Sequence, residues 1–208
     1  LWSAAMFAWF FLSALYLQLV LGYSSLEVGL AFLPATLIMG SFSLGLSAKL
    51  VMRYGIRGPV AVGMLLVAIG LALFARAPVD GSFVVDVLPS MVILGLGVGM
   101  AMNPVLLAAM SDVEPSESGL ASGLVNTSFM MGGALGLAVL ASIAASRADG
   151  SAGSGDEHLA ALTAGYHSAF IVGAVFALAA AVLAAALIRA TPATAHGEIE
   201  EEPAAEAA

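Results

Sequence analysis

Six long apolar segments constrain this chain of 208 residues more than any other feature of its sequence. A helix needs about 20 mainly apolar residues to cross the hydrocarbon core of a bilayer. A transmembrane barrel would instead show alternating segments of about ten residues, whereas stretches such as 60–74 and 169–188 are apolar on every side. The sequence therefore predicts an all-α, multi-pass membrane protein. Its six predicted transmembrane helices cover residues 2–21, 28–48, 59–75, 83–110, 118–146 and 166–188.

Composition excludes the other broad classes of protein. Apolar residues make up 61% of the chain and charged residues 10%, against about 25% charged in a typical soluble domain. Fourteen acidic against six basic residues argue against a nucleic-acid-binding protein. There is no cysteine, and His158, His167 and His196 lack the spacing of metal ligands, so we expect no metal and no cofactor.

The two ends of the chain differ from the apolar segments. The chain opens on Leu1 rather than Met and without a basic leader, so we expect a truncated or processed chain rather than one that starts with a signal peptide. After Arg189 the composition changes to Thr, Pro, Ala and Glu. We therefore predict a membrane domain over 1–189 and a disordered, acidic tail over 190–208.

Basic residues indicate the orientation, because short loops rich in Lys and Arg stay in the cytoplasm. The connection between the second and third predicted helices holds Lys49, Arg53 and Arg57, and Arg189 begins the tail on the same side. The opposite side has only two of the six basic residues. We predict that this connection and both termini are cytoplasmic, and that the protein lies in the cell membrane.

Polarity differs among the six predicted helices. The third helix, and the last from residue 169 onward, carry no polar side chain, whereas the other four helices do. The order of two polar helices followed by one apolar helix occurs twice along the chain. This order predicts two three-helix repeats of the kind found in transporters. Polar groups are costly in hydrocarbon unless they face protein or water. The two apolar helices are therefore predicted to face lipid, for example at Leu71 and Val182.

Glycines at intervals of four predict close contacts between helices, because a small residue lets two backbones approach. Two prolines inside the spans, Pro34 and Pro104, are predicted to bend their helices. The predicted packing glycines are Gly95 and Gly99 in the segment 83–110, and Gly119, Gly123, Gly132 and Gly136 in the segment 118–146.

Polar and soft side chains inside the predicted spans are candidates for a substrate-binding cavity. Amides can hydrogen-bond a ligand, and Met and aromatic side chains repack around ligands of different shape. The alternative is that the amides only bond neighbouring helices, at about 0.6 kcal/mol each, and that the larger apolar groups only pack. The cavity-lining candidates are Tyr16, Gln18, Asn103, Asn126 and Met130.

Five motifs together resemble the major facilitator superfamily, and more narrowly the C-terminal six-helix half of its fourteen-spanning drug:proton antiporters. The motifs are YLQLVLGYS at 16–24, AKLVMRYGIR at 48–57, GLGVG at 95–99 with Pro104, SGLASG at 118–123, and NTS at 126–128 with GGALG at 132–136. The second motif is similar to the loop motif of the family, which here comprises Lys49, Arg53, Gly55 and Arg57.

Two departures from the family pattern accompany this resemblance. Ala48 and Met52 stand where the loop motif usually has Gly and Asp, and Phe129 and Met130 follow the NTS motif where Arg and Gln are frequent. The resemblance implies proton-driven efflux of amphipathic compounds by alternating access between two halves. It also implies an N-terminal half, upstream of Leu1, that holds the proton-coupling carboxylate.

Two other classes of function stay open. An intramembrane enzyme would need a pair such as Ser/Lys, Asp/Asp or His/Glu at membrane depth, and the predicted spans hold none, since Glu27 and Asp86 lie near span ends. A truncated chain could also be a non-catalytic membrane scaffold or partner subunit. The sequence favours a transporter whose partners are the bilayer, the missing half, protons and an amphipathic small molecule, with no nucleic acid.

Overall fold

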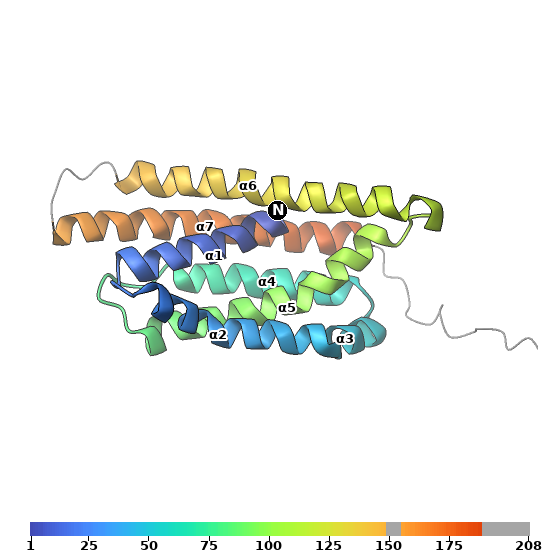
Figure 1. The fold of residues 1–208 in the computed structure, drawn as a ribbon, viewed down its shortest axis with the longest axis horizontal. Coiled ribbons are helices and arrows are strands. Elements are labelled where there is room, and N and C mark those ends of the chain that lie inside the picture. The colour runs from blue at the N-terminus through green and yellow to red at the C-terminus, as the bar shows by residue number, and fades with distance from the viewer. Residues whose placement is uncertain (149–154, 189–208) are drawn as a thin grey trace, which may run out of the picture.

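The computed structural model describes residues 1–148 and 155–188, and these residues form helices and connecting turns without any strand. The helices run roughly along one long axis (Figure 1). Six helical segments are long and apolar enough to cross a membrane, which confirms the predicted fold class. The α-helices are α1 (Trp2–Leu19), α2 (Ser25–Ser41), α3 (Ser47–Tyr54), α4 (Arg57–Phe74), α5 (Leu88–Met110), α6 (Ser118–Ala148) and α7 (Asp156–Leu187).

Short helical turns extend three of the spans. A π-helical turn, Phe42–Leu46, follows α2 at the end of the second span and joins it to α3. Another π-helical turn, Phe83–Val87, leads into α5, and a 3-10 turn, Pro115–Glu117, leads into α6. In the second span the residue that leaves helical geometry is Gly45, with φ 121°, rather than Pro34. Glycine adopts a positive φ at little cost, and the chain changes direction there.

Polar residues at helix ends explain two differences from the predicted bounds. α7 begins at Asp156, ten residues before the predicted start at 166, because acidic residues in a first turn stabilise a helix without adding to its apolar character. α2 begins at Ser25, where a capping box forms. The Ser24 N–H donates to Glu27 Oε2 at 2.8 Å, and the Glu27 N–H donates to Ser24 Oγ at 3.4 Å.

The helices pair as two inverted three-helix repeats. The first repeat is α1, α2 and α4, the second is α5, α6 and α7, and equivalent helices run in opposite directions (Figure 1). α1 packs on α6 as α5 packs on α2, so the first helix of each repeat contacts the second helix of the other. The two third helices, α4 and α7, pack on each other. This crossed pairing agrees with the repeat predicted from the order of polar and apolar helices.

The contact between α5 and α2 depends on two of the predicted packing glycines. A Cβ on Gly95 would lie 2.8 Å from the Ala35 Cα, and a Cβ on Gly99 would lie 3.2 Å from the Met39 Cα. Neither position therefore has room for a larger side chain while α5 keeps its distance from α2.

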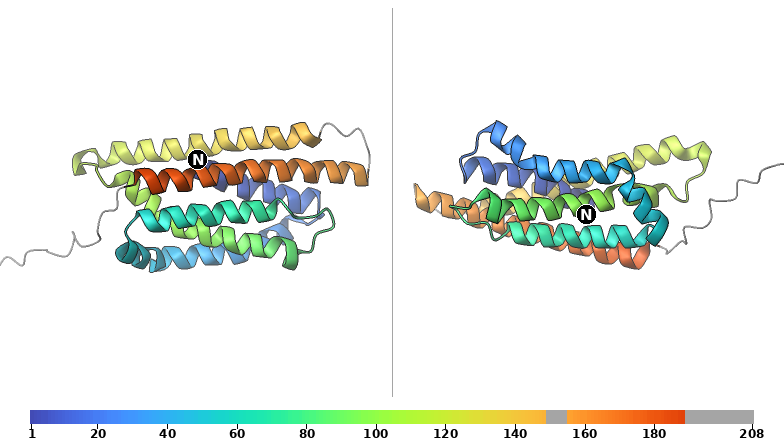
Figure 2. Two further views of the ribbon diagram at one scale, coloured as in Figure 1. Left: turned by 180° about the vertical axis from the view of Figure 1, so that it is seen from behind. Right: turned by 90° about the horizontal axis from the view of Figure 1, so that it is seen from below.

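The two broad sides of the bundle differ in their exposed side chains. α4 and α7 lie on one side, and α1, α2 and α6 lie on the other (Figure 2). Large exposed side chains of α4 and of the membrane-spanning part of α7 are aliphatic, and we call this surface the aliphatic face. It includes Val62, Leu65, Ile69, Ile171, Val175, Leu178, Val182 and Leu183.

The prediction that the third helix faces lipid is wrong for one side of α4. That side packs between α5 and α7, and Leu71 is 0% exposed. A Cβ on Gly173 of α7 would lie 3.4 Å from Leu71 Cδ1. Val182, in contrast, is exposed. Composition cannot separate the two positions, because an aliphatic side chain suits a helix interface as well as it suits lipid.

Candidate transport face

The side of the bundle formed by α1, α2 and α6 carries exposed polar side chains on helices long and apolar enough to cross a membrane, and we call it the open face. Three of its hydroxyl groups, on Thr36, Ser41 and Thr127, donate to carbonyls of their own helices. The Gln18 and Asn126 amides are exposed and form no hydrogen bond with the described residues. The exposed polar residues of the open face are Gln18, Thr36, Ser41, Ser122, Asn126, Thr127 and Ser128.

Asn126 lies on the same side of α6 as the residues that pack against α1. It precedes Gly133 by seven residues, which is close to two helical turns. Gly133 is buried, and a Cβ added at this position would lie 2.8 Å from Phe7 Cδ2 of α1. One side of α6 is thus covered by α1 at Gly133 and uncovered at Asn126, with the half-exposed Met130 between them.

Two glycine pairs on α6 have different surroundings. A Cβ on Gly132 would lie 2.7 Å from Ser3 Oγ, and a Cβ on Gly136 would overlap the Ala4 Cβ, both on α1. Positions 119 and 123, which are also glycines, have no atom of the described residues within 4 Å of a built Cβ. The first half of α6 therefore presents a glycine surface that no described helix covers.

A concavity of about 440 Å³ lies between α1 and α6. Small-molecule sites usually enclose about 300–1,000 Å³, so the volume fits part or all of a drug-sized compound. Aromatic rings surround it: Phe7 meets Phe129 at 5.7 Å between centroids, and Phe10 stacks on Phe32 of α2 at 5.3 Å. The lining is Met6, Phe7, Phe10, Phe11, Ala14 and Leu137, without a charged group.

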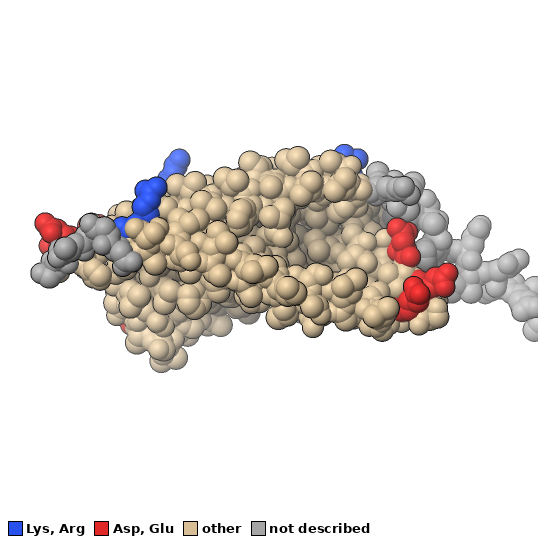
Figure 3. Space-filling view, turned by 90° about the horizontal axis from the view of Figure 1, so that it is seen from above, with Lys and Arg blue, Asp and Glu red and all other residues tan. Residues whose placement is uncertain are grey.

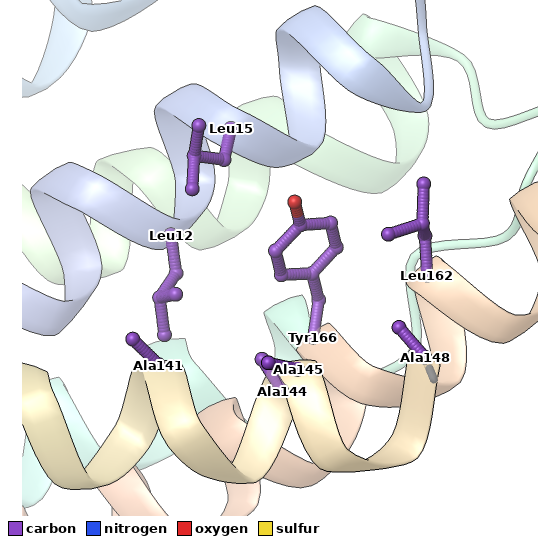
Figure 4. A pocket seen from close by; sticks show the side chains of 8 residues that line it. All are labelled: Leu12, Leu15, Ala141, Ala144, Ala145, Ala148, Leu162 and Tyr166. Atoms are coloured by element: carbon purple, nitrogen blue, oxygen red, sulfur yellow. The ribbon is translucent and has the colours of Figure 1, made fainter. Parts of the chain in front are cut away.

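A second cavity, of about 180 Å³, lies where α1, α6 and α7 meet. Figure 4 shows the Tyr166 ring projecting from α7 towards α1, with its hydroxyl as the polar group of the lining. This volume is below the usual range for a small-molecule site. The lining is Leu12, Leu15, Ala141, Ala144, Ala145, Ala148, Leu162 and Tyr166, and we attribute the cavity to small side chains that do not fill the junction.

Tyr16, a predicted cavity residue, does not line the open face. It is 1% exposed, and its hydroxyl donates to the Pro78 carbonyl at 2.6 Å in the connection between α4 and α5. Its ring meets Phe74 edge-on at 5.7 Å. Asn103 is half-buried beside Pro104 on α5. Of the five predicted cavity residues, Gln18, Asn126 and Met130 are therefore the exposed ones.

The loop motif forms a separate cluster at one end of the bundle. Lys49 and Arg53 are exposed on α3, and Arg57 is exposed at the start of α4. Gly55 makes the turn between these helices with φ 71°, a conformation that favours glycine. The motif residues lie outside the concavity.

The sequence predicts aromatic and Met side chains as a possible cavity lining, but Phe7 and Phe11 are not among the five predicted cavity residues. A signal for them existed in the spacing of α1. Phe7, Phe11, Ala14 and Gln18 recur at intervals of four, three and four, the pattern of one helix face. That face coincides with the side of α1 that stays exposed or half-buried.

Charged side chains gather towards the two ends of the molecule, and a broad uncharged band separates them on the surface seen in Figure 3. The sequence of α5 follows this pattern, because no Asp, Glu, Lys or Arg occurs between Asp86 and Asp112. Charge at the centre of a bilayer is costly, so the band has the character of a membrane-embedded surface. No proton-carrying carboxylate lies at its centre among the described residues.

Comparison with known proteins adds to this geometry. Residues 1–137 match the family model of the Major Facilitator Superfamily. The cephamycin export protein of Amycolatopsis lactamdurans is 36% identical over 197 residues, which cover 95% of this chain and 39% of that protein. The puromycin resistance protein of Streptomyces alboniger is 36% identical over 65% of this chain and 27% of its own length.

A third relative is the tetracenomycin C resistance and export protein of Streptomyces glaucescens, which is 35% identical over 66% of this chain and 25% of its own length. The chain thus spans about two fifths of the length of the cephamycin export protein and about a quarter of the other two.

Proposed function

Because this chain belongs to the Major Facilitator Superfamily, we propose that it is the C-terminal, six-helix half of a secondary transporter that exports amphipathic compounds. The relatives described above are named as export and resistance proteins. In the proposed mechanism this bundle rocks against an upstream half around a site at the bilayer midplane, so that the site opens to one side of the membrane at a time.

The contrast between the two faces of the bundle carries this proposal. The aliphatic face exposes Val62, Ile171 and Val182, which suit lipid. The open face exposes the Asn126 amide within the span of α6 and the Gln18 amide near the end of α1. An amide within a span is costly against lipid and suits a water-filled cavity or a protein partner. A bundle that separates its surfaces in this way is built to be covered on one side only.

Substrate contacts are proposed on the open face, in the concavity between α1 and α6. Its rings and thioether, including Phe7, Phe11 and Met6, would pack against the apolar part of a compound. Gln18, Asn126 and Met130 lie exposed on the same two helices and would contact its polar part and its edges. Asn103 is kept as a more distant candidate on α5.

Proton coupling is proposed to reside in the upstream half. Coupling needs an ionisable group whose protonation biases two global states, and such groups are functional mainly when they lie deep in the membrane. Glu27 lies in the first turn of α2, and Asp86 precedes α5. Both are therefore proposed as residues of the membrane boundary, and the coupling carboxylate is proposed to precede Leu1.

The chain is a multi-pass membrane protein, and we propose the cell membrane as its location. The end that carries Lys49, Arg53 and Arg57 is proposed to be cytoplasmic, in keeping with the preference of basic loops for that side. The proposed cytoplasmic, acidic tail, 190–208, lies outside the described residues, as does Arg189.

Efflux measurements test the proposal. The chain would be produced in bacteria that lack their own drug exporters, alone and together with the proposed upstream half, and the cells would be loaded with ethidium. We expect uncoupler-sensitive ethidium efflux only when both halves are present. Efflux from the chain alone would overturn the proposal and indicate a self-sufficient oligomer.

A pair of variants shows whether the open face is the working face. We call the chain produced together with the upstream half the two-half protein. In the two-half protein Asn126→Leu is expected to lower ethidium efflux, whereas Val182→Leu on the aliphatic face is expected to leave it unchanged. Equal effects of the two substitutions at equal protein levels would remove the assignment of the open face.

A further inference from the structure

We propose that α3, with the π-helical turn before it and Arg57 after it, forms a binding site for the headgroup of an anionic phospholipid. The proposal concerns the end of the bundle rather than the open face. It does not depend on the proposed transport function, because lipid binding can be measured on a protein that transports nothing.

The backbone turns α3 out of the direction of the spans. The chain leaves α2 through Phe42–Leu46, where Gly45 has φ 121°, and enters α4 through Gly55 with φ 71°. Between these two glycines α3 crosses the end of the bundle, as the right-hand view of Figure 2 shows. A short helix in this orientation at the end of a membrane-spanning bundle lies in the plane of the bilayer interface.

The side chains of this segment combine exposed apolar groups with exposed cations. Leu44 is 92% exposed, Met52 65% and Tyr54 60%. Lys49 and Arg53 are exposed on the same helix. An amphipathic helix of this kind buries its apolar side chains at the boundary between headgroups and acyl chains while its cations stay at headgroup level.

The three cations of the segment lack acidic partners among the described residues. Lys49, Arg53 and Arg57 form no ion pair there, and no Asp or Glu occurs in the sequence between Glu27 and Asp80. The Arg53 guanidinium lies 5.3 Å from the centroid of the Tyr54 ring, a contact that leaves its N–H groups available to an anion. Unpaired cations at headgroup level attract anionic lipid.

Acidic residues at the same end of the bundle lie in a different place. Asp112, Glu114 and Glu117 belong to the connection between α5 and α6. In Figure 1 this connection projects at the upper right, above α3 at the lower right. Among the described residues at this end the basic and acidic groups are therefore separate, and the basic group forms a local positive surface.

The exposed apolar side chains identify the ligand as a lipid rather than free phosphate. A soluble phosphate would use the cations alone and would leave Leu44, Met52 and Tyr54 in water. A phospholipid offers its phosphate to Lys49 and Arg53 and its acyl chains to the apolar groups beside them, so it matches both parts of the surface.

Lipid enrichment beside α3 tests the proposal on the whole 208-residue chain. Because the chain has no cysteine, an Ala48→Cys variant can carry a single bimane fluorophore. It would be placed in nanodiscs of phosphatidylcholine with one fifth phosphatidylglycerol, with bromine atoms on the acyl chains of one lipid or the other. The ratio of the two quenching strengths reports the local proportion of phosphatidylglycerol.

We expect the ratio of phosphatidylglycerol to phosphatidylcholine near Ala48 to exceed its bulk value by about fivefold, the factor that one cation at an anionic surface supplies. The Lys49→Gln/Arg53→Gln/Arg57→Gln variant is expected to return the ratio to the bulk value. The charge-preserving Lys49→Arg/Arg53→Lys/Arg57→Lys variant is expected to keep the enrichment, which separates loss of charge from loss of folding.

Two further arms complete the test. Arg76→Gln/Arg147→Gln, which removes cations from the opposite end, is expected to leave the enrichment unchanged. Millimolar inorganic phosphate is expected not to displace the lipid, and displacement would show that the site is for soluble phosphate. Absence of enrichment, or equal enrichment in the Gln and charge-preserving variants, would overturn the proposal.

Discussion

The two halves of α6 carry the same glycine spacing in opposite surroundings. Gly132 and Gly136 lie against α1, whereas Gly119 and Gly123 have no described atom within 4 Å of a built Cβ. Helices in a membrane gain little hydrophobic free energy from meeting, so small residues are concentrated where backbones approach. The comparison shows that no described residue covers the first half of α6 at these glycines, and this supports the proposal that the upstream half packs there.

The same contrast between a covered and an uncovered position recurs elsewhere. Leu71 and Val182 are both aliphatic, and the first is buried while the second is exposed. Tyr16 and Gln18 are both polar and lie two residues apart on α1, and again the first is buried and the second exposed. Each pair allows a substitution at a covered position to be compared with one at an uncovered position.

The largest effect is expected for leucine in place of the two glycines of α6. Gly136→Leu forces a side chain into the space of Ala4 and should lower the free energy of unfolding of the chain by about 3 kcal/mol. Gly123→Leu should change it by less than about 0.5 kcal/mol. The measurement is SDS-induced unfolding followed by Trp fluorescence, since Trp2 lies 5.3 Å from Phe129 across the α1–α6 contact.

An equal loss of stability in the two leucine variants would contradict the comparison, because it would mean that position 123 is covered in the chain alone. A smaller residue sharpens the result. Gly136→Ala should fall between the wild-type chain and Gly136→Leu, since Ala4 leaves no space even for one methyl group.

Glutamine in place of an aliphatic residue should distinguish the buried position on α4 from the exposed position on α7 by its effect on stability. Leu71→Gln leaves a buried amide without a partner and should cost about 2 kcal/mol of unfolding free energy. Val182→Gln should cost much less, because it lies near the end of α7, where a long side chain can reach the headgroups. The same SDS titration measures both, and a larger loss for Val182→Gln would reverse the assignment of faces.

If the upstream half packs on the first half of α6, replacing a glycine there by a larger residue should impair transport. In the two-half protein, Gly123→Leu is expected to lower ethidium efflux by about tenfold, equivalent to about 1.4 kcal/mol, although it leaves the stability of the chain alone unchanged. Leu124→Ala, on a neighbouring exposed position, serves as the control for expression. Full efflux by Gly123→Leu would show that the partner does not pack on these glycines.

The number of spans, their repeat and the roles of Gly95 and Gly99 as contact positions follow from the sequence, because each depends on local composition or spacing. The surroundings of Leu71, Tyr16 and Gly119 do not, because they depend on which neighbour reaches each helix face. Spacing shows that Gly119 and Gly132 are alike. Only the path of α1, which covers one and not the other, distinguishes them.

The change of chain direction after α2 and the start of α7 could not be predicted from the sequence either. The chain turns at Gly45, although the residues around it do not predict a turn. Pro34, which the sequence predicts to bend its helix, stays inside α2. A proline in a membrane helix can be tolerated because nearby groups satisfy the freed carbonyl. The start of α7 at Asp156 was missed because its first turn is acidic. These errors arise where polar or flexible residues continue a helix beyond its apolar part.

The smallest expected effect concerns the polar pair on α1. Tyr16→Phe removes one hydroxyl and its hydrogen bond to the Pro78 carbonyl, and should lower the free energy of unfolding by about 1 kcal/mol. Gln18→Leu removes an exposed amide that bonds no described residue, so the stability of the chain should stay the same. In ethidium efflux by the two-half protein the order should reverse, with Gln18→Leu affected and Tyr16→Phe not, because only Gln18 reaches the open face. If Tyr16→Phe lowered efflux at unchanged stability, the tyrosine hydroxyl would have to serve the transported compound, and the structural role given to its bond with Pro78 would be wrong.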